Sequence, residues 1–295
     1  MRSKMCAVLL MLFLSSQTGV FTAADEPLSE KVPEWRLESG LFGGTNPLVG
    51  GLNSRIDYSV PLHRHRSGPL WESTRVEAGM AILANPSFTD LLGRFYLEPV
   101  AVFDVRLEGG VRAHYTTFGY GLAGMESYRD ELPAAGGPDP GRSAEAGYFL
   151  RAAPRVKGAF GPVIATSTFA ATWYRFPEKR TRFLEESVSL RVISDEDWVL
   201  QQTSQLLYRF AASRRSPFSG IGLEHTAAWV PGASSGDQDP SHRLALVGVY
   251  VHQLRTNLSL QTALFAGGYP TGEPFGEDRL YLLGAVTLAA QVPQR

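Results

Sequence analysis

The sequence of 295 residues contains a single cysteine, Cys6, and no apolar run long enough to cross a membrane as a helix. One cysteine excludes a framework of intramolecular disulfides. Acidic and basic residues nearly balance, with a formal net charge of −1, so the composition gives no electrostatic basis for nucleic-acid binding. Fold and function must therefore be read from the order of polar and apolar residues along the chain.

Motifs for common catalytic chemistries are also missing. The sequence has no glycine-rich phosphate loop and no nucleophile elbow. On the expected strands no histidine is followed by a serine two positions later, and His114 is followed by Thr116. His63 and His65 have the spacing of a metal-binding pair, but they lie on an expected basic turn without a third ligand nearby. We therefore expect neither an enzyme nor a metal site.

Residues 1–24 have the three parts of a secretory signal peptide. A basic start is followed by the apolar run Met5–Leu14 and by the small residues Thr22-Ala23-Ala24 at the expected cleavage site. We interpret residues 25–34, which are polar, as a periplasmic lead to the folded domain. Since Cys6 lies within the signal peptide, the mature chain would contain no cysteine.

The clearest periodicity lies in Leu92–Leu107. Apolar residues such as Phe95 and Leu97 occupy odd positions, and polar residues such as Arg94 and Glu98 occupy even ones. A period of two places the two sets on opposite faces of a β-strand, so we interpret the stretch as one long strand. Gly109-Gly110 would lie near the next reversal, and residues 119–143 show no strand pattern.

Similar alternation recurs along the chain, and no helical pattern is left to cover the apolar faces. We therefore predict an all-β fold, a transmembrane antiparallel up-and-down β-barrel of about 12 strands over residues 35–292, with a lipid-facing outside and a polar inside. An even count places both ends in the periplasm and the long connections on the outer side: 119–143, 175–197, 231–241 and 267–278. An extra strand in Phe183–Val192 with an undetected partner would give 14 strands instead.

Charged residues on the inward faces are the candidate site. They are expected either to form a packed interior of cross-strand ion pairs or to line an aqueous passage that favours anionic or polar solutes. Arginine suits the second alternative because its planar group makes forked contacts with carboxylate and phosphate. The predicted lumen-lining residues are Arg55, Asp57, Arg75, Glu77, Arg94, Glu98, Asp104, Arg106, Arg112, Arg151 and Arg155.

The signal peptide, the hairpin rhythm and the unequal loops resemble those of Gram-negative outer-membrane β-barrel proteins. Three short motifs are similar to a poorly characterised family of predicted barrels: Asp197-Trp198-Val199-Leu200, Glu98-Pro99-Val100-Ala101-Val102 and Thr117-Phe118-Gly119. The resemblance implies the cell outer membrane as the location. One departure is the end of the sequence, Gln291–Arg295, where such barrels usually have an aromatic residue that the assembly machinery reads.

The sequence therefore predicts a narrow pore or transport channel for small polar or anionic solutes. The alternatives are a non-conducting structural or surface-interaction barrel with a salt-bridged, plugged interior, and a soluble exported β-protein. Expected partners are outer-membrane lipid, the outer-membrane assembly machinery and small polar solutes, with no cofactor and no nucleic acid.

Overall fold

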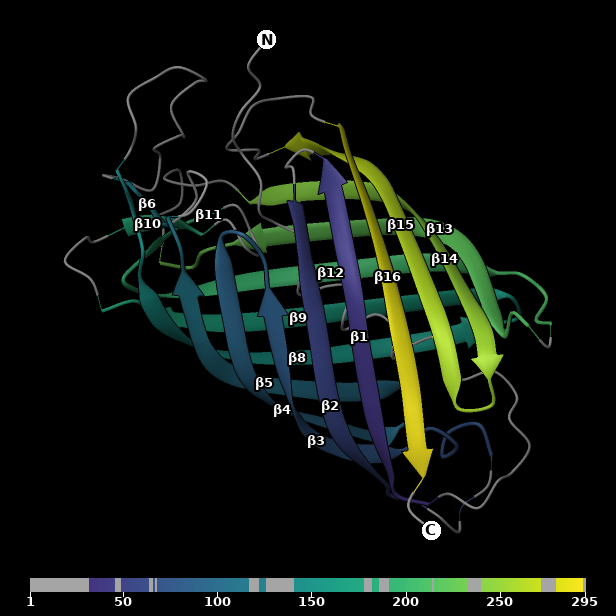
Figure 1. Ribbon diagram of the computed structural model, residues 1–295. Coiled ribbons are helices and arrows are strands. Elements are labelled where there is room, and N and C mark those ends of the chain that lie inside the picture. Colours follow the sequence, from purple (N-terminus) through teal and green to yellow (C-terminus); the bar gives the residue numbers. More distant parts are fainter. Residues whose placement is uncertain are drawn as a thin grey trace.

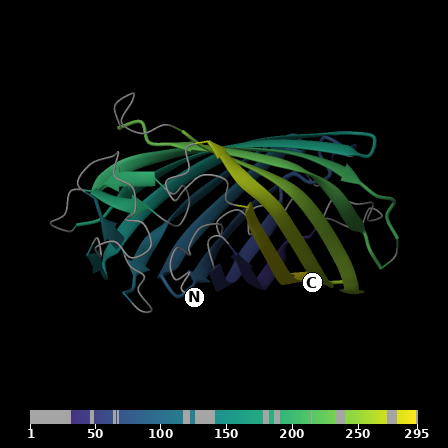
Figure 2. The same ribbon diagram turned by 90° about the horizontal axis from the view of Figure 1, so that it is seen from above.

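A closed antiparallel barrel of twelve strands dominates the fold (Figure 1). The computed structural model describes residues 32–45, 49–63, 66, 68–116, 122–125, 141–177, 182–185, 191–213, 215–232, 240–271 and 280–293. Each barrel strand is hydrogen-bonded to its two neighbours, and the ring closes where β1 pairs with β16 (Figure 2). The predicted fold class is confirmed. Within the described residues, no helix is both long and apolar enough to cross a membrane.

The barrel strands follow one another in chain order, apart from four short strands that form a separate sheet. Their bounds are β1 Glu34–Thr45, β2 Val49–Pro61, β3 Arg75–Ala84, β4 Phe88–Val100, β5 Phe103–His114, β8 Ala146–Phe160, β9 Val163–Arg175, β12 Glu196–Arg209, β13 Phe218–Trp229, β14 Ser241–Arg255, β15 Leu258–Thr271 and β16 Leu280–Pro293. Residues 1–31, including the predicted signal peptide, lie outside the described residues.

The outward face of the barrel is largely apolar, as a lipid-facing surface requires. Met80 on β3 and Leu282 on β16 are 56% and 55% exposed. Trp198 and Tyr208 also point outward, near opposite ends of β12, in the positions of two interfacial aromatic girdles. This surface is that of a transmembrane barrel, because so much exposed apolar area would be unfavourable in water.

The stretch Leu92–Leu107 is not one strand, and that prediction is wrong. β4 ends at Val100, Ala101-Val102 turns the chain, and β5 begins at Phe103. Gly109-Gly110, which the sequence placed near a reversal, lies inside β5. The number of barrel strands is unaffected because the same region still contributes one hairpin.

The error has a geometric cause. In the β4–β5 hairpin, Phe95 pairs with Leu107 and Leu97 pairs with Val105, so odd-numbered residues lie opposite odd-numbered residues. Both strands therefore turn their odd positions to the same side of the sheet. The alternation runs through the turn without changing phase, and periodicity alone cannot detect the reversal.

Four short strands form a small sheet from two of the long connections. They are β6 Leu122–Gly124, β7 Arg142–Ser143, β10 Arg182–Glu185 and β11 Arg191–Ser194, in the order β11-β10-β6-β7. The prediction of no strand in residues 119–143 is thus wrong. Phe183–Val192 contributes to β10 and β11 rather than to the barrel, so the barrel has twelve strands and not fourteen.

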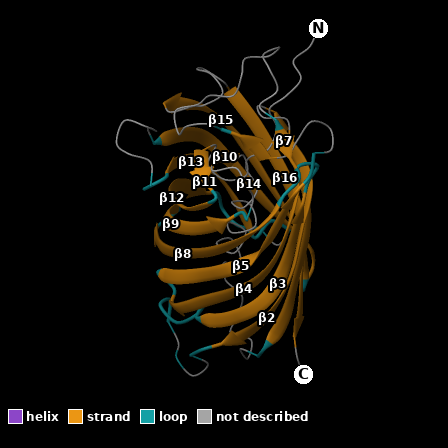
Figure 3. Cartoon of the chain, turned by 90° about the vertical axis from the view of Figure 1, so that its left-hand side faces the viewer, coloured by secondary structure: helices purple, strands orange, loops and turns teal. Residues whose placement is uncertain are grey.

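The small sheet packs at the end of the barrel away from the C-terminus (Figure 3). Phe183 and Ile193 from this sheet cluster with Phe149 and Tyr174, which are inward-facing residues of β8 and β9. We call the whole cluster the apolar cap; its members are Leu92, Leu122, Phe149, Tyr174, Phe176, Phe183, Ile193, Val199 and Val230. The cap lies at the end of the barrel that carries the long connections. The first barrel strand, β1, begins at the opposite end, and the last one, β16, finishes there.

An apolar region interrupts the polar inside that the sequence predicts, although β12, β13 and β14 also turn Gln205, Glu224 and Arg243 inward, with Arg243 paired to Glu224 at 2.8 Å. Inward residues of β12–β16 form a second buried apolar cluster: Leu207, Phe218, Ala245, Val247, Val249, Val251, Phe265, Tyr281 and Leu283. We call this surface the apolar inner wall. Leu244 and Leu246 of β14 face outward between these inward residues. This part of β14 is apolar on both faces because one face meets lipid and the other belongs to the apolar inner wall.

Candidate functional site

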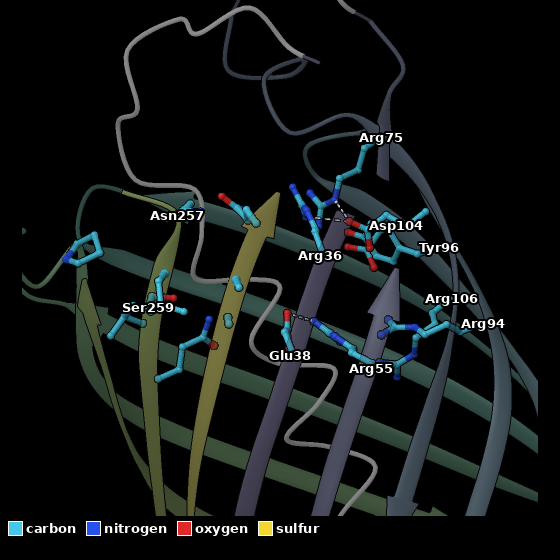
Figure 4. Close-up of a pocket in the computed structure, with 18 of the residues that line it drawn as sticks. Arg36, Glu38, Arg55, Arg75, Arg94, Tyr96, Asp104, Arg106, Asn257 and Ser259 are labelled. Carbon is cyan, nitrogen blue, oxygen red and sulfur yellow. Dashed lines mark hydrogen bonds and ion pairs between the residues drawn. The ribbon is translucent and has the colours of Figure 1, made fainter. Parts of the chain in front are cut away.

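A cavity of about 150 Å³ lies inside the barrel, toward the end where β1 begins and β16 ends. One side is charged and the other is neutral, with Asn257 and Ser259 facing the charged side from β15 and the turn before it (Figure 4). We call it the lumen cavity. Its charged lining residues are six arginines, Arg36, Arg55, Arg75, Arg94, Arg106 and Arg155, and three acids, Glu38, Glu77 and Asp104.

A continuous chain of ion pairs runs along one side of the mouth of the lumen cavity. We call it the mouth chain, and it runs across β1, β3, β4, β8 and β5. Its contacts are Glu34–Arg36 at 2.6 Å, Arg36–Glu77 at 2.8 Å, Glu77–Arg75 at 2.7 Å, Arg75–Glu98 at 2.8 Å, Glu98–Lys157 at 2.7 Å, Lys157–Asp104 at 3.0 Å and Asp104–Arg155 at 2.9 Å. Acidic and basic groups alternate along it, so each interior charge lies beside its opposite.

Glu98 is the most heavily bonded carboxylate of the mouth chain, and it is fully buried. Besides its two cationic partners it accepts hydrogen bonds from Tyr96 Oη at 2.8 Å and from Ser73 Oγ at 2.5 Å. The Arg75 guanidinium also lies over the Tyr96 ring, 4.9 Å from its centroid. This arrangement fixes the carboxylate and the guanidinium, as expected of a structural network.

A second group of charges, the central cluster, lies further along the lumen. Its members are Glu38, Arg55, Asp57, Arg94, Arg106, Glu108 and Arg151. Arg94 Nη1 lies 3.1 Å from Asp57 Oδ2, and Asp57 also neighbours Arg55 at 3.6 Å. Arg106 and Arg151 share Glu108, at 3.2 and 3.7 Å. Four arginines thus meet three carboxylates, which leaves a positive charge in excess.

Arginines of the central cluster present buried hydrogen-bond donors that this network does not use, and two of these arginines, Arg94 and Arg106, line the lumen cavity. Arg94 and Arg106 lie side by side and point toward Arg55 (Figure 4). The Nε atoms of both are buried and have no hydrogen-bond partner among the described residues. Arg106 Nε lies near Glu108 but without the alignment of a hydrogen bond. Buried donors of this kind favour an anion as a partner.

The eleven residues that the sequence singled out are distributed over three levels of the interior. Arg75, Glu77, Glu98, Asp104 and Arg155 belong to the mouth chain. Arg55, Asp57, Arg94, Arg106 and Arg151 belong to the central cluster. The last, Arg112, pairs with Asp90 below the apolar cap, so it lies apart from the lumen cavity.

Several interior charges were absent from that prediction: Glu34, Arg36, Glu38, Asp90, Glu108 and Lys157. Lys157 lies on β8, which continues to Phe160 and carries the Lys157 side chain to Glu98. Asp90 and Glu108 occupy inward positions of β4 and β5, just outside the stretch Leu92–Leu107. Strict application of the alternation from Arg94 and Arg106 would have included both residues.

The metal-binding potential of the described residues is low. Among those residues, no group of three or more His, Cys, Asp or Glu side chains is placed to hold a metal ion. The sequence contains one His-x-Ser step, His65-Arg66-Ser67, in the connection between β2 and β3. His65 and Ser67 lie outside the described residues.

No family model matches the sequence, and no curated protein does. Solved outer-membrane barrels resemble the structure at low identity. The translocator domain of autotransporter NalP from Neisseria meningitidis has a TM-score of 0.46 and 9% identity, covering 94% of this chain and 92% of that one. The β-domain of the Bordetella autotransporter BrkA has a TM-score of 0.45 and 11% identity over 90% and 100%. KdgM porin has a TM-score of 0.35 and 8% identity over 86% and 98%.

The location follows from the strand topology and the two faces described above. A closed barrel satisfies every strand edge internally, and its apolar outside matches hydrocarbon. The protein is an outer-membrane β-barrel.

Proposed function

We propose that this barrel is a narrow channel for small anionic solutes and that the central cluster is its selectivity filter. The observation that carries the proposal is the pair of arginines Arg94 and Arg106, which line the lumen cavity and whose buried Nε donors have no hydrogen-bond partner among the described residues. Rings of arginine and lysine favour anions in pores.

The balance of charge supports anions over cations. Six arginines and three acids line the lumen cavity, so a cation would meet an excess of positive charge there. The opposite side contributes uncharged polar groups, including Gln261 and Gln291, that can hydrate a passing solute. The mouth chain would hold the arginine side chains in position, because its ion pairs link β1, β3, β4, β5 and β8.

A non-conducting barrel is the second candidate, and the apolar cap favours it. The cap joins residues of the small sheet to inward residues of β4, β8, β9 and β12 at the outer end, and the apolar inner wall fills another part of the interior. If the cap never moves, the lumen cavity is open only toward the end of the barrel where β1 begins and β16 finishes.

Ion conduction across planar bilayers distinguishes these two functions. In a KCl gradient, the channel proposal predicts a reversal potential near that of chloride. The double substitution Arg94→Gln and Arg106→Gln should shift this reversal potential toward zero. Arg255→Gln, at the exposed end of β14, should leave the reversal potential unchanged. Heat-dependent gel mobility of each protein would show that the barrel is folded. Folded wild-type protein that leaves the bilayer electrically silent would overturn the channel and support the closed barrel.

A further inference from the structure

A polar patch interrupts the lipid-facing surface of β9, β12, β13 and β14. Gln202 and Ser204 lie on β12 between the outward aromatic residues Trp198 and Tyr208, and hence near the middle of the apolar belt. Ser167, His225 and His242 contribute to the same surface from the neighbouring strands. On β3 the corresponding outward residues are Val76, Ala78, Met80 and Ile82. We call the five residues Ser167, Gln202, Ser204, His225 and His242 the outer polar patch.

The strand register places these side chains next to one another. Ser204 is directly opposite Ser167 on β9 and His225 on β13. Gln202 and His242 both lie opposite Ala227, on either side of β13. The patch is therefore one continuous surface, crossing four strands, and not a set of isolated polar positions.

Internal hydrogen bonds satisfy only part of this patch. Ser167 Oγ and Ser204 Oγ are 3.2 Å apart, and His225 Nε2 lies 3.1 Å from His242 Nδ1 with the rings stacked. The Gln202 side chain is exposed and makes no hydrogen bond with another described residue. Each imidazole also keeps one ring nitrogen outside the pair. Hydrocarbon cannot replace the hydrogen bonds that these groups would make in water.

A shallow apolar groove adjoins the patch. Its walls include Leu206, Leu223, Leu244 and Leu246, with His225 at its side. A packed protein surface could bury the leucines in the groove and satisfy the polar groups beside it at the same time. Polar side chains beside close-packed apolar ones are typical of contacts between membrane-embedded segments.

We propose that the outer polar patch is the interface through which two copies of this chain associate in the membrane. The argument for a second copy is complementarity with itself. A carboxamide carries both a donor and an acceptor, so two Gln202 side chains related by a two-fold axis can form a reciprocal pair of hydrogen bonds. The free imidazole nitrogens supply another donor and acceptor. The proposal does not depend on whether the barrel conducts.

Cysteine cross-linking in isolated outer membranes tests the contact directly. A Gln202→Cys variant should form a disulfide-linked species of twice the monomer mass, because a two-fold axis brings position 202 of both copies together. Met80→Cys, at an outward and exposed position of β3 on another side of the barrel, is the matched control and should remain monomeric. Equal cross-linking at both positions, or a product containing a different protein, would overturn the proposal.

Dimerisation measured in lipid provides the second test. Gln202→Leu should weaken it by about tenfold, the effect of losing a hydrogen-bonded pair in a membrane. Met80→Leu should leave it unchanged, and heat-dependent gel mobility should confirm that both variants form the barrel. Single-molecule photobleaching of the wild type that shows one step per particle at all protein densities would reject the interface, as would unchanged dimerisation in Gln202→Leu.

Discussion

Arg112 and Asp90 form a two-point ion pair inside the barrel wall: Nε and Nη2 of the guanidinium donate to the two carboxylate oxygens, each at 2.7 Å. Both residues are fully buried. The guanidinium also lies 4.3 Å from the centroid of the Phe88 ring. The pair connects β4 to β5 between the central cluster and the apolar cap. Its loss should therefore lower the free energy of unfolding and leave solute selectivity unchanged.

Removing one partner of this pair should destabilise the barrel strongly. Asp90→Asn leaves the Arg112 charge buried without its counter-charge, which costs about 3–5 kcal/mol. Urea unfolding in lipid vesicles would measure the change. Replacing both residues by apolar ones, Asp90→Leu with Arg112→Met, should recover most of the loss. Asp195→Asn, at an exposed position, should change the unfolding free energy by less than about 0.5 kcal/mol.

A charge placed on the apolar inner wall should not be tolerated. Val247 is 1% exposed and belongs to the cluster that contains Phe265 and Leu283. Val247→Asp would bury a carboxylate with no partner and lower the unfolding free energy by several kcal/mol. Gln291→Glu, at a position that lines the lumen cavity and pairs with Arg36 on β1, should have a much smaller effect. Equal stability of the two variants would mean that Val247 faces water.

Spin labels can test the β4–β5 hairpin. A label at Phe95 or Leu107 should be relaxed by oxygen from the bilayer, because both side chains face outward and are 40% and 46% exposed. A label at Val102, in the turn, should instead be relaxed by a water-soluble nickel reagent. A label at Arg94 should respond weakly to oxygen. Strong oxygen relaxation at Val102 would contradict the turn.

The apolar cap should loosen when its central ring is removed. Phe183 is fully buried and contacts Phe176 with ring centroids 6.0 Å apart. Phe183→Ala should increase proteolysis of the β10–β11 segment while the barrel keeps its heat-dependent gel mobility. If the barrel conducts, the same variant should raise the open probability. Phe160→Ala, at a position that is 89% exposed, is the control and should change neither property.

Alternation was sufficient to predict the barrel, because each strand meets lipid on one face and the interior on the other. It was insufficient wherever both faces have the same character. β14 shows this limit: Leu244 and Leu246 face lipid, and Val247 and Val249 face the interior, yet all are apolar. The small sheet was missed for another reason. Its strands have two to four residues, and its pairing joins Leu184 to the distant Ala123.

For the candidate site, the sequence predicts which face of its strand a residue occupies, but not which residue on another strand it contacts. The face of a charged residue follows from its parity within the strand, so Arg75 and Arg155 could be placed on the inward side. Its partner depends on the register between strands, which alternation does not determine. Arg155 pairs with Asp104, 51 positions away, and Lys157 reaches Glu98, 59 positions away. The mouth chain therefore becomes visible only when the sheet is assembled.

The pairing of β1 with β16 determines when the barrel can close during folding. Glu34 lies opposite Pro293 and Thr45 opposite Leu282, so the first strand has no neighbour on that side until the last one has been made. Every other strand pairing of the barrel joins barrel strands that follow one another in chain order, with at most strands of the small sheet between them. Loop closure between such distant segments is slow and entropically costly. The unpaired edges of β1 and β16 must therefore be shielded from other chains until the ring is complete.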